Sequence, residues 1–276
     1  RPRRHPVRLG RAGLTQALAE MTDHMNTPQN ELERALFAAA TDAAARPNFY
    51  KVLAESDVLI LYVGDPPPIT NGVVTEATNL SLPNIEIQGR MHIPFFSSEA
   101  RLTAGARFLG MRALDLFKFT KGSHLVLNPG SDFGKLFVPS EISEILDGSL
   151  FIPRDTLTVK KGSEQLIGQP KDYPIDFVKA VERFLSGEPS VTSAFLAQHF
   201  IAGTHTEPAL LVAVSAPEKD FERIAAGIGI IARETKKAQN IVDITRLRDG
   251  ENHSYFASQK PFYSRKKQGL LSRLFG

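Results

Sequence analysis

The chain has 276 residues and contains no cysteine. This absence excludes disulfides, thiol catalysis, cysteine-ligated zinc and thiolate-held iron–sulfur clusters. Long apolar runs are missing too: the longest, 58–63 and 209–214, are far shorter than the roughly 20 residues of a membrane-spanning helix. Hydrophobic residues make up 42% and charged residues 23%, which is typical of a globular protein. With no sign of a secretory environment, we expect a cytoplasmic location.

Positive charge is concentrated at the two ends of the chain. Residues 1–26 carry a net charge of +3 and residues 260–276 carry +5, whereas the body at 27–259 carries −5, for a total of +3. A protein body that binds nucleic acid would carry its basic residues on one folded face. We therefore expect no nucleic-acid partner.

Helices and strands are mixed throughout the sequence without a strict βαβ alternation. This pattern predicts an α+β fold with two consecutive mixed α/β domains, each a small sheet with packed helices. We place the domains at 27–150 and 156–260, preceded by a basic leader at 1–26 and followed by a basic amphiphilic tail at 261–276. We expect the leader to be disordered or not native, with a transit peptide as the alternative.

Several elements can be assigned in the first domain. Thr27 is predicted to cap the first helix and Pro47 to end it. A hairpin is predicted at Gln88-Gly89, because flanking residues alternate between apolar and polar. Ser97 and Ser98 are expected to cap a helix, and the apolar spacing over 109–119 predicts another.

The second domain also carries clear signals. Helices are predicted to begin at Pro174 and Pro217, because their apolar residues recur with helical spacing. Strands are predicted over 191–200 and 209–214, and a last edge strand at Tyr255-Phe256.

No catalytic constellation is evident in the sequence. The turn around Gly130 resembles a phosphate loop, but three residues rather than four separate it from Gly134, and no Ser or Thr follows Lys135. The side chains that could form an all-histidine and carboxylate metal site match no helical ligand spacing, so we interpret them as ordinary turn and edge residues. They are His199, His205, Glu207 and His253. We therefore predict a protein that is not an enzyme and has no cofactor or metal.

The basic end of the chain is the strongest signal for an interaction. After Arg265, Leu271, Leu274 and Phe275 would lie on one face of a short helix with Leu270. So short a helix needs a surface to fold on, which could be the protein's own body, an acidic partner or an anionic membrane. The alternative is a disordered tail, or one packed on its own domain.

Three distinctive motifs follow one another along the chain. They are Arg46-Pro-Asn-Phe49-Tyr50, Pro94-Phe95-Phe96-Ser97-Ser98-Glu99 and Asn128-Pro129-Gly130-Ser131. Together with the ending Pro261-Phe262-Tyr263, this arrangement resembles the enhanced-serine-sensitivity family, SseB. The resemblance spans about 30–263 and implies a bacterial protein with an N-terminal and a C-terminal SseB domain. It supplies no catalytic residues.

The matched residues suggest a structural role, with interaction as the alternative. Phe49, Tyr50, Phe95 and Phe96 are expected to fill a core, or else to form an exposed aromatic patch. The turn at 128–131 is expected to fix strand register. We predict a non-catalytic interaction or regulatory protein linked to serine or amino-acid tolerance, with protein partners. The alternatives are a small-molecule sensor or enzyme with an inter-domain pocket, and peripheral membrane association through the tail.

Overall fold

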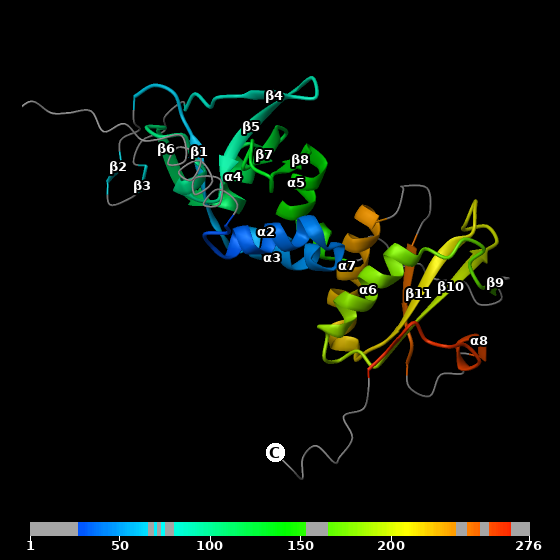
Figure 1. Cartoon of the computed structure of the whole chain (residues 1–276). Coiled ribbons are helices and arrows are strands. Elements are labelled where there is room, and N and C mark those ends of the chain that lie inside the picture. The colour runs from blue at the N-terminus through cyan, green and yellow to red at the C-terminus, as the bar shows by residue number, and fades with distance from the viewer. Residues whose placement is uncertain are drawn as a thin grey trace, which may run out of the picture. The chain divides into compact units, whose positions relative to one another are not determined.

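The computed structural model in Figure 1 forms two compact units. The first contains the chain up to Phe37 together with Lys51–Ser143, and the second contains Ala38–Tyr50 and the chain from Glu144 onward. The segment 38–50 therefore belongs with the second unit, although the sequence places it within the first domain. The residues that the structure describes are 27–65, 69–70, 73–74, 80–152, 165–235, 242–248 and 254–265.

A mixed sheet forms the centre of the first unit. Its strands run in the order β6-β1-β5-β7-β8, with β4 paired to β5. Only β5 and β7 pair in parallel, and β4 and β5 form the hairpin predicted at Gln88-Gly89, where both residues have positive φ. The bounds are β1 Asp57–Leu61, β4 Ile85–Ile87, β5 Arg90–Phe96, β6 Phe108–Arg112, β7 His124–Leu127 and β8 Lys135–Phe137.

Three phenylalanines dominate the core of the first unit. Phe95 of β5, Phe137 of β8 and Phe117 of helix α4 (Ala113–Phe119) are fully buried. Their ring centroids lie 5.6 to 6.0 Å apart, within the range of favourable aromatic pairs. The chain then enters helix α5 (Pro139–Leu146), where Ile142 is also fully buried.

The first helix differs from the prediction at both ends. Helix α2 spans Glu31–Thr41, and its cap is Asn30 rather than Thr27, because the Asn30 side chain accepts a hydrogen bond from the Glu33 amide. The helix ends six residues before Pro47, where Asp42 is extended and caps the short helix η1 (Ala43–Ala45). Pro47 instead occupies the first turn of helix α3 (Arg46–Glu55), where a missing N–H leaves no bond unmade.

Two other helix predictions in this unit are only partly right. The predicted helix over 109–119 begins only at Ala113, because all five residues of β6 pair with β1. Here strand pairing overrides the helical spacing of the apolar residues. Ser98 precedes only a three-residue helix, η2 (Glu99–Arg101), and makes no side-chain capping bond there.

The second unit has its own mixed sheet. The strand order is β12-β11-β10-β13. Strand β9 also pairs with β10, along the same edge as β13 but further toward the end of β10. All pairs are antiparallel except β11 and β12, which helix α7 (Glu218–Thr235) connects. The strand bounds are β9 Gln165–Gly168, β10 Ser193–Ile201, β11 Ala209–Ser215, β12 Val242–Arg246 and β13 Tyr263–Ser264.

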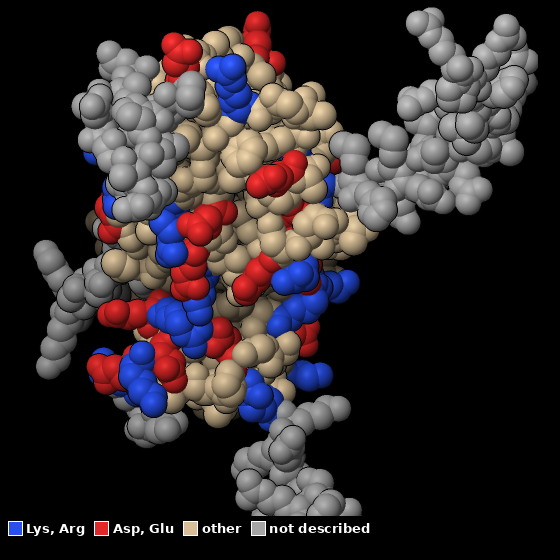
Figure 2. All heavy atoms as spheres, turned by 90° about the vertical axis from the view of Figure 1, so that its left-hand side faces the viewer, with Lys and Arg blue, Asp and Glu red and all other residues tan. Residues whose placement is uncertain are grey.

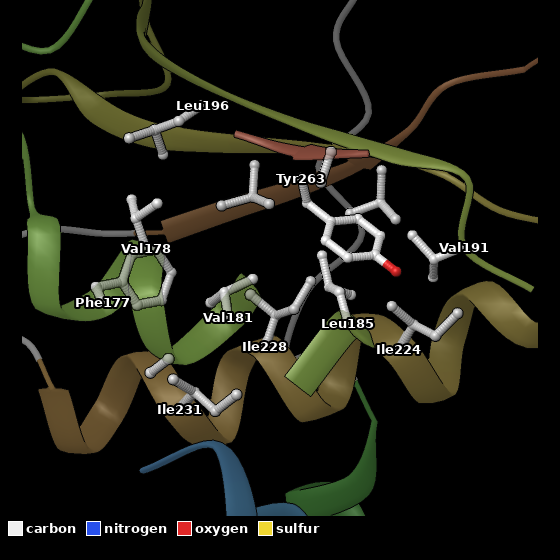
Figure 3. Close-up of a cluster of buried hydrophobic side chains, with 14 of the residues drawn as sticks. Phe177, Val178, Val181, Leu185, Val191, Leu196, Ile224, Ile228, Ile231 and Tyr263 are labelled. Carbon is white, nitrogen blue, oxygen red and sulfur yellow. The ribbon is translucent and has the colours of Figure 1, made fainter. Parts of the chain in front are cut away.

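Helices α6 (Ile175–Ser186) and α7 cover one face of this sheet (Figure 1). Figure 3 shows Val181 of α6 and Ile228 of α7 pointing toward the strands, while Tyr263 of β13 reaches down between sheet and helices. On the opposite face, helix α8 (Ser254–Ala257) packs Phe256 against Phe195, with ring centroids 5.6 Å apart. The predicted edge strand at 255–256 is therefore a short helix, and β13 is the last strand of this sheet within the described part of the chain.

Three short elements complete the described chain. Strands β2 (Ile69–Thr70) and β3 (Val73–Val74) pair with each other, and η3 spans Ser149–Phe151. Two mixed sheets, each packed with helices, confirm the predicted α+β class. None of the helices within the described ranges is both long and apolar enough to cross a membrane.

Candidate functional site

Three polar residues of the sequence motifs, Ser97, Ser98 and Asn128, meet around one buried carboxylate, that of Glu33. Glu33 lies in the first turn of α2 and is only 4% exposed. Arg101 Nη2 donates to its Oε2 at 2.6 Å, and the backbone N–H of Gln29 donates to the same oxygen at 2.9 Å. The hydroxyls of Ser97 and Ser98 both donate to Oε1 at 2.7 Å. We call this set of groups the Glu33 network.

These donors determine the ionisation of Glu33. Burial by itself raises the pKa of the carboxyl, because it disfavours the charged form. The hydrogen bonds from Arg101, Gln29, Ser98 and Ser97 outweigh burial and lower the pKa to about 2. Glu33 is therefore a carboxylate at any physiological pH.

Asn128 joins the Glu33 network from the end of β7. It is 2% exposed and adopts the left-handed conformation, with φ of 49°, which Asn tolerates better than most residues. Its Oδ1 accepts from the Ser97 amide at 3.0 Å, and its Nδ2 donates to Ser97 Oγ at 2.8 Å. The Ser97 hydroxyl thus links the Asn128 amide to the Glu33 carboxylate.

The rest of the predicted turn is also built by local bonds. Gly130 has φ of 78°, and the Ser131 amide donates to the Asn128 carbonyl at 3.2 Å. Ser131 Oγ in turn accepts from the Phe133 amide at 3.0 Å. Pro129 lies inside this turn, where no ladder hydrogen bond is required of it.

The Glu33 network is poorly suited to catalysis. A serine nucleophile needs a nearby base whose pKa lies close to the working pH. The partner of Ser97 is a carboxylate with a pKa of about 2, which is far too acidic to take the hydroxyl proton. The arrangement instead ties α2 to the ends of β5 and β7.

The aromatic motif residues are buried. Phe49, Tyr50, Phe95 and Phe96 are each at most 7% exposed, so they form no exposed aromatic patch. Arg46 begins α3 and donates from Nε to the Ala39 carbonyl at 3.3 Å.

Residues 262–265 belong to the second sheet rather than to a free tail. The Phe262 amide donates to the Ala194 carbonyl at 2.9 Å, and Tyr263 is buried among the core side chains. Arg265 donates from Nε to the Val191 carbonyl at 3.0 Å and from Nη2 to the Glu188 carbonyl. The last described strand therefore ends at Ser264, four residues beyond the boundary expected at 260. Leu271, Leu274 and Phe275 lie outside the described residues, so the role of the tail remains a prediction.

A second polar cluster lies on the α8 face of the second sheet, and the sequence had indicated only two of its members, His199 and His205. His199 Nε2 is 2.6 Å and His205 Nε2 is 3.1 Å from Asp243 Oδ2. The two imidazole rings meet edge to face with centroids 4.8 Å apart. Of the histidine and carboxylate candidates, Glu207 is exposed and outside this cluster, and His253 lies outside the described residues. Asp243 gave no signal in the sequence because it lies 38 residues beyond His205.

Acidic and basic side chains are interspersed on the molecular face drawn in Figure 2. Where the described residues are visible there, no broad patch of one sign is seen. The ion pairs within a single unit include Lys135 with Glu141 at 2.9 Å and Arg183 with Asp42 at 2.7 Å.

The two sheets and the Glu33 network define a class of two-domain α+β protein whose polar motif residues bond to one another. Comparison with known families names the class more closely. A model of the SseB protein N-terminal domain matches residues 32–144, and a model of the SseB protein C-terminal domain matches residues 159–265. The chain belongs to the SseB family.

The curated relatives agree with this assignment. The chain is 31% identical over 257 residues to Protein SseB of Escherichia coli strain K12, which covers 90% of this chain and 96% of that protein. Protein SseB of Shigella flexneri gives the same values. The search of solved structures gave no significant match.

Proposed function

We propose that this SseB-family chain is a non-catalytic interaction or regulatory protein of the cytoplasm that affects serine or amino-acid tolerance. The observation that carries the proposal is the Glu33 network. The polar side chains at the centre of the family motifs bind one another in the interior, where a substrate would have to displace them. Motif residues of this kind stabilise the fold. Any binding of a partner would then involve the side chains on the surface of the protein.

Exposed apolar side chains on sheet edges are suitable contacts for a protein partner. Leu136 on the edge strand β8 and Val138 just after it are 38% and 41% exposed, and both point away from the side of buried Phe137. In the second unit, Leu166 on β9 is 71% exposed. An edge strand also offers unpaired backbone groups to a partner.

Affinity capture from a bacterial lysate, followed by reconstitution with the purified candidate, tests the proposal. The baits are the full chain and two matched variants, Leu136→Lys and Leu166→Lys, which change one exposed edge leucine in each unit. We expect the full chain to bind one protein with defined stoichiometry and one variant to lose it. A chain ending after Arg265 tests the tail without removing β13. Failure of every bait to bind a partner would contradict the proposal.

A parallel screen separates the proposal from the enzyme or sensor alternative. Thermal unfolding of the full chain is measured with each amino acid and common nucleotide in turn. Stabilisation by several degrees with one metabolite would indicate a ligand site and count against a purely protein-binding role.

The link to serine is tested by expressing the chain in E. coli lacking its own relative and measuring growth on added serine. Leu136→Lys and Leu166→Lys are then compared, and the variant that loses the partner should also lose complementation.

A further inference from the structure

We propose that His199, His205 and Asp243 form a binding site for a divalent transition-metal ion of the zinc class. The three residues come from separate parts of the second unit: strand β10, the β10–β11 turn and strand β12. Each offers one donor atom, and these atoms all lie within 4.8 Å of one another. This set of two imidazoles and one carboxylate goes beyond the proposed function, which requires no metal.

The spacing of the donor atoms is close to what a metal needs. Tetrahedral zinc with bonds of about 2.0–2.1 Å keeps its ligand atoms roughly 3.3 Å apart. Asp243 Oδ2 lies 2.6 Å from His199 Nε2 and 3.1 Å from His205 Nε2. The three donor atoms all lie within 4.8 Å of one another. An ion would be admitted by side-chain rotations that widen the two distances to Asp243 and bring the imidazole nitrogens to about the same spacing.

The burial of the three side chains fits a site with one open position. The side chains of His199 and His205 are 3% and 5% exposed, whereas that of Asp243 is 23% exposed. A carboxylate at the solvent edge gives an ion a route in, and the two imidazoles form the protected inner wall. Zinc sites with three protein ligands complete their coordination with water or another small ligand.

The register of the sheet explains why these residues meet. His199 pairs with Ala209 of β11, and Asp243 pairs with Leu211 of the same strand. The two side chains therefore reach toward each other across β11 from its opposite sides. His199 Nε2–H donates to Asp243 Oδ2, and His205 Nε2 lies 3.1 Å from the same oxygen. Because His205 Nδ1 accepts the Ile201 amide, we place the His205 proton on Nε2. A cation bound to both Nε2 atoms would displace these protons.

The outer nitrogens of the rings have different partners. His199 Nδ1 lies 3.1 Å from the Gln165 amide group, which can present its oxygen after a flip and accept the Nδ1–H of a metal-bound imidazole. His205 Nδ1 accepts the Ile201 amide at 3.2 Å. Metal binding through Nε2 moves the His205 proton to Nδ1 and breaks that bond. The amide of the buried Ile201 then loses its acceptor, which lowers affinity by about 5- to 100-fold.

The donor set also predicts which ions bind. Imidazole nitrogen suits Zn²⁺, Co²⁺, Ni²⁺ and Cu²⁺, whereas Mg²⁺ and Ca²⁺ prefer all-oxygen sites. Calorimetric titration of the untagged, chelator-treated full chain with Zn²⁺, Co²⁺ and Mg²⁺ tests this. We expect one Zn²⁺ per chain, weaker Co²⁺ and no Mg²⁺ at this site.

Variants assign the bound ion to these residues. Changing a residue that only hydrogen-bonds a metal ligand typically weakens binding 10–100-fold. We expect Gln165→Ala to fall within that range. Asp243→Asn and His205→Gln, which remove or alter a ligand itself, should weaken Zn²⁺ binding by more. The matched control is His124→Gln. His124 lies next to His92, with ring centroids 5.3 Å apart, but that pair belongs to none of the metal-type clusters found among the described residues. The His124→Gln variant should therefore leave the Zn²⁺ affinity unchanged.

A spectroscopic readout on the unmodified chain avoids the question of whether a variant folds. Long-range ¹H–¹⁵N correlation spectra distinguish Nε2–H from Nδ1–H imidazole. We expect His205 to change from the Nε2–H to the Nδ1–H form as Zn²⁺ is added. The proposal is overturned if Zn²⁺ binding is not saturable, if His124→Gln weakens it as much as Asp243→Asn, or if both imidazoles keep Nε2–H at saturating Zn²⁺.

Discussion

Gly227 lies so close to Phe184 that a Cβ on the glycine would be 2.3 Å from Cζ of the phenylalanine ring. The two residues belong to α7 and α6, the helices that together cover one face of the second sheet. Glycine inside a helix ordinarily destabilises it by about 1 kcal/mol relative to alanine. Here it permits the close approach of the neighbouring helix.

We predict that Gly227→Ala destabilises the protein by about 1–3 kcal/mol, because overpacking exceeds the gain in helix propensity. Gly229, two residues further along α7, has open space at its Cβ position and provides the control. Gly229→Ala should stabilise by up to about 1 kcal/mol. Urea unfolding monitored by circular dichroism measures both changes. Equal effects of the two alanines would refute the packing argument.

The Glu33 network predicts a loss of stability in acid. The pKa of Glu33 falls from its ordinary value of 4.5 to about 2 in the folded protein, so its contribution is fully present above about pH 4.5. It is lost as the pH falls toward 2, because the unfolded chain then binds the proton more readily. A shift of this size corresponds to about 3 kcal/mol.

Glu33→Gln tests this pH dependence. The variant should be less stable near neutral pH by about 3 kcal/mol, because it leaves the buried Arg101 without its carboxylate. Its stability should then fall less steeply than that of the unmodified chain between about pH 5 and pH 3. Glu99→Gln, at an exposed position in the same region, is the control and should keep the original slope. Parallel slopes for all three proteins would contradict the assignment.

Asn128 has two separable roles, which different substitutions distinguish. Asn128→Gly keeps the left-handed backbone accessible but removes the bonds to Ser97, and should cost about 1–3 kcal/mol. Asn128→Ala removes the same bonds and also strains the backbone, which should add about 1–2 kcal/mol. Unfolding of the two variants in urea gives the difference directly. Alanine at least as stable as glycine would show that the positive φ imposes no constraint.

The end of the second sheet predicts where the chain can be shortened. A chain ending after Arg265 retains β13 and should unfold like the full chain. A chain ending at Lys260 loses the buried Tyr263 ring and the β13 pairing with β10, and should lose about 3–5 kcal/mol or more. Resistance to limited proteolysis, measured alongside urea unfolding, compares the two. Similar resistance would mean that β13 contributes little.

Periodicity identified most elements because their apolar residues face a core. The helix from Pro217 was predictable because Phe221, Ile224, Ile228 and Ile231 recur with helical spacing, and α7 begins one residue after Pro217. The predicted strand over 209–214 coincides with β11, which ends one residue later. Predictions failed where a distant partner decides the conformation. The pairing of β6 with β1 keeps Leu109 in a strand, although its spacing with Ala113 and Phe117 is helical.

The two polar clusters were harder to predict than the elements that carry them. Ser97 and Ser98 looked like helix caps because hydroxyls commonly fill that role. Nothing local indicated that their hydroxyls donate hydrogen bonds to Glu33, more than 60 residues earlier. His199 and Asp243 lie 44 residues apart on strands separated by β11. Sequence spacing cannot reveal such a meeting, because the sheet register that produces it depends on the whole unit.

The second unit is built from two segments that are far apart in the sequence, which constrains how the chain can fold while it is being synthesised. Its core includes Tyr263 of β13, and Ala43 of helix η1 packs against that core, although the two residues lie more than 200 positions apart in the chain. The early segment must therefore remain available while nearly the whole chain is made, and the sheet closes only when its last strand emerges. A gene fragment cut at the boundary between the two family domains would lack 38–50, so exchanging domains between relatives would need to carry this early segment along with the C-terminal half.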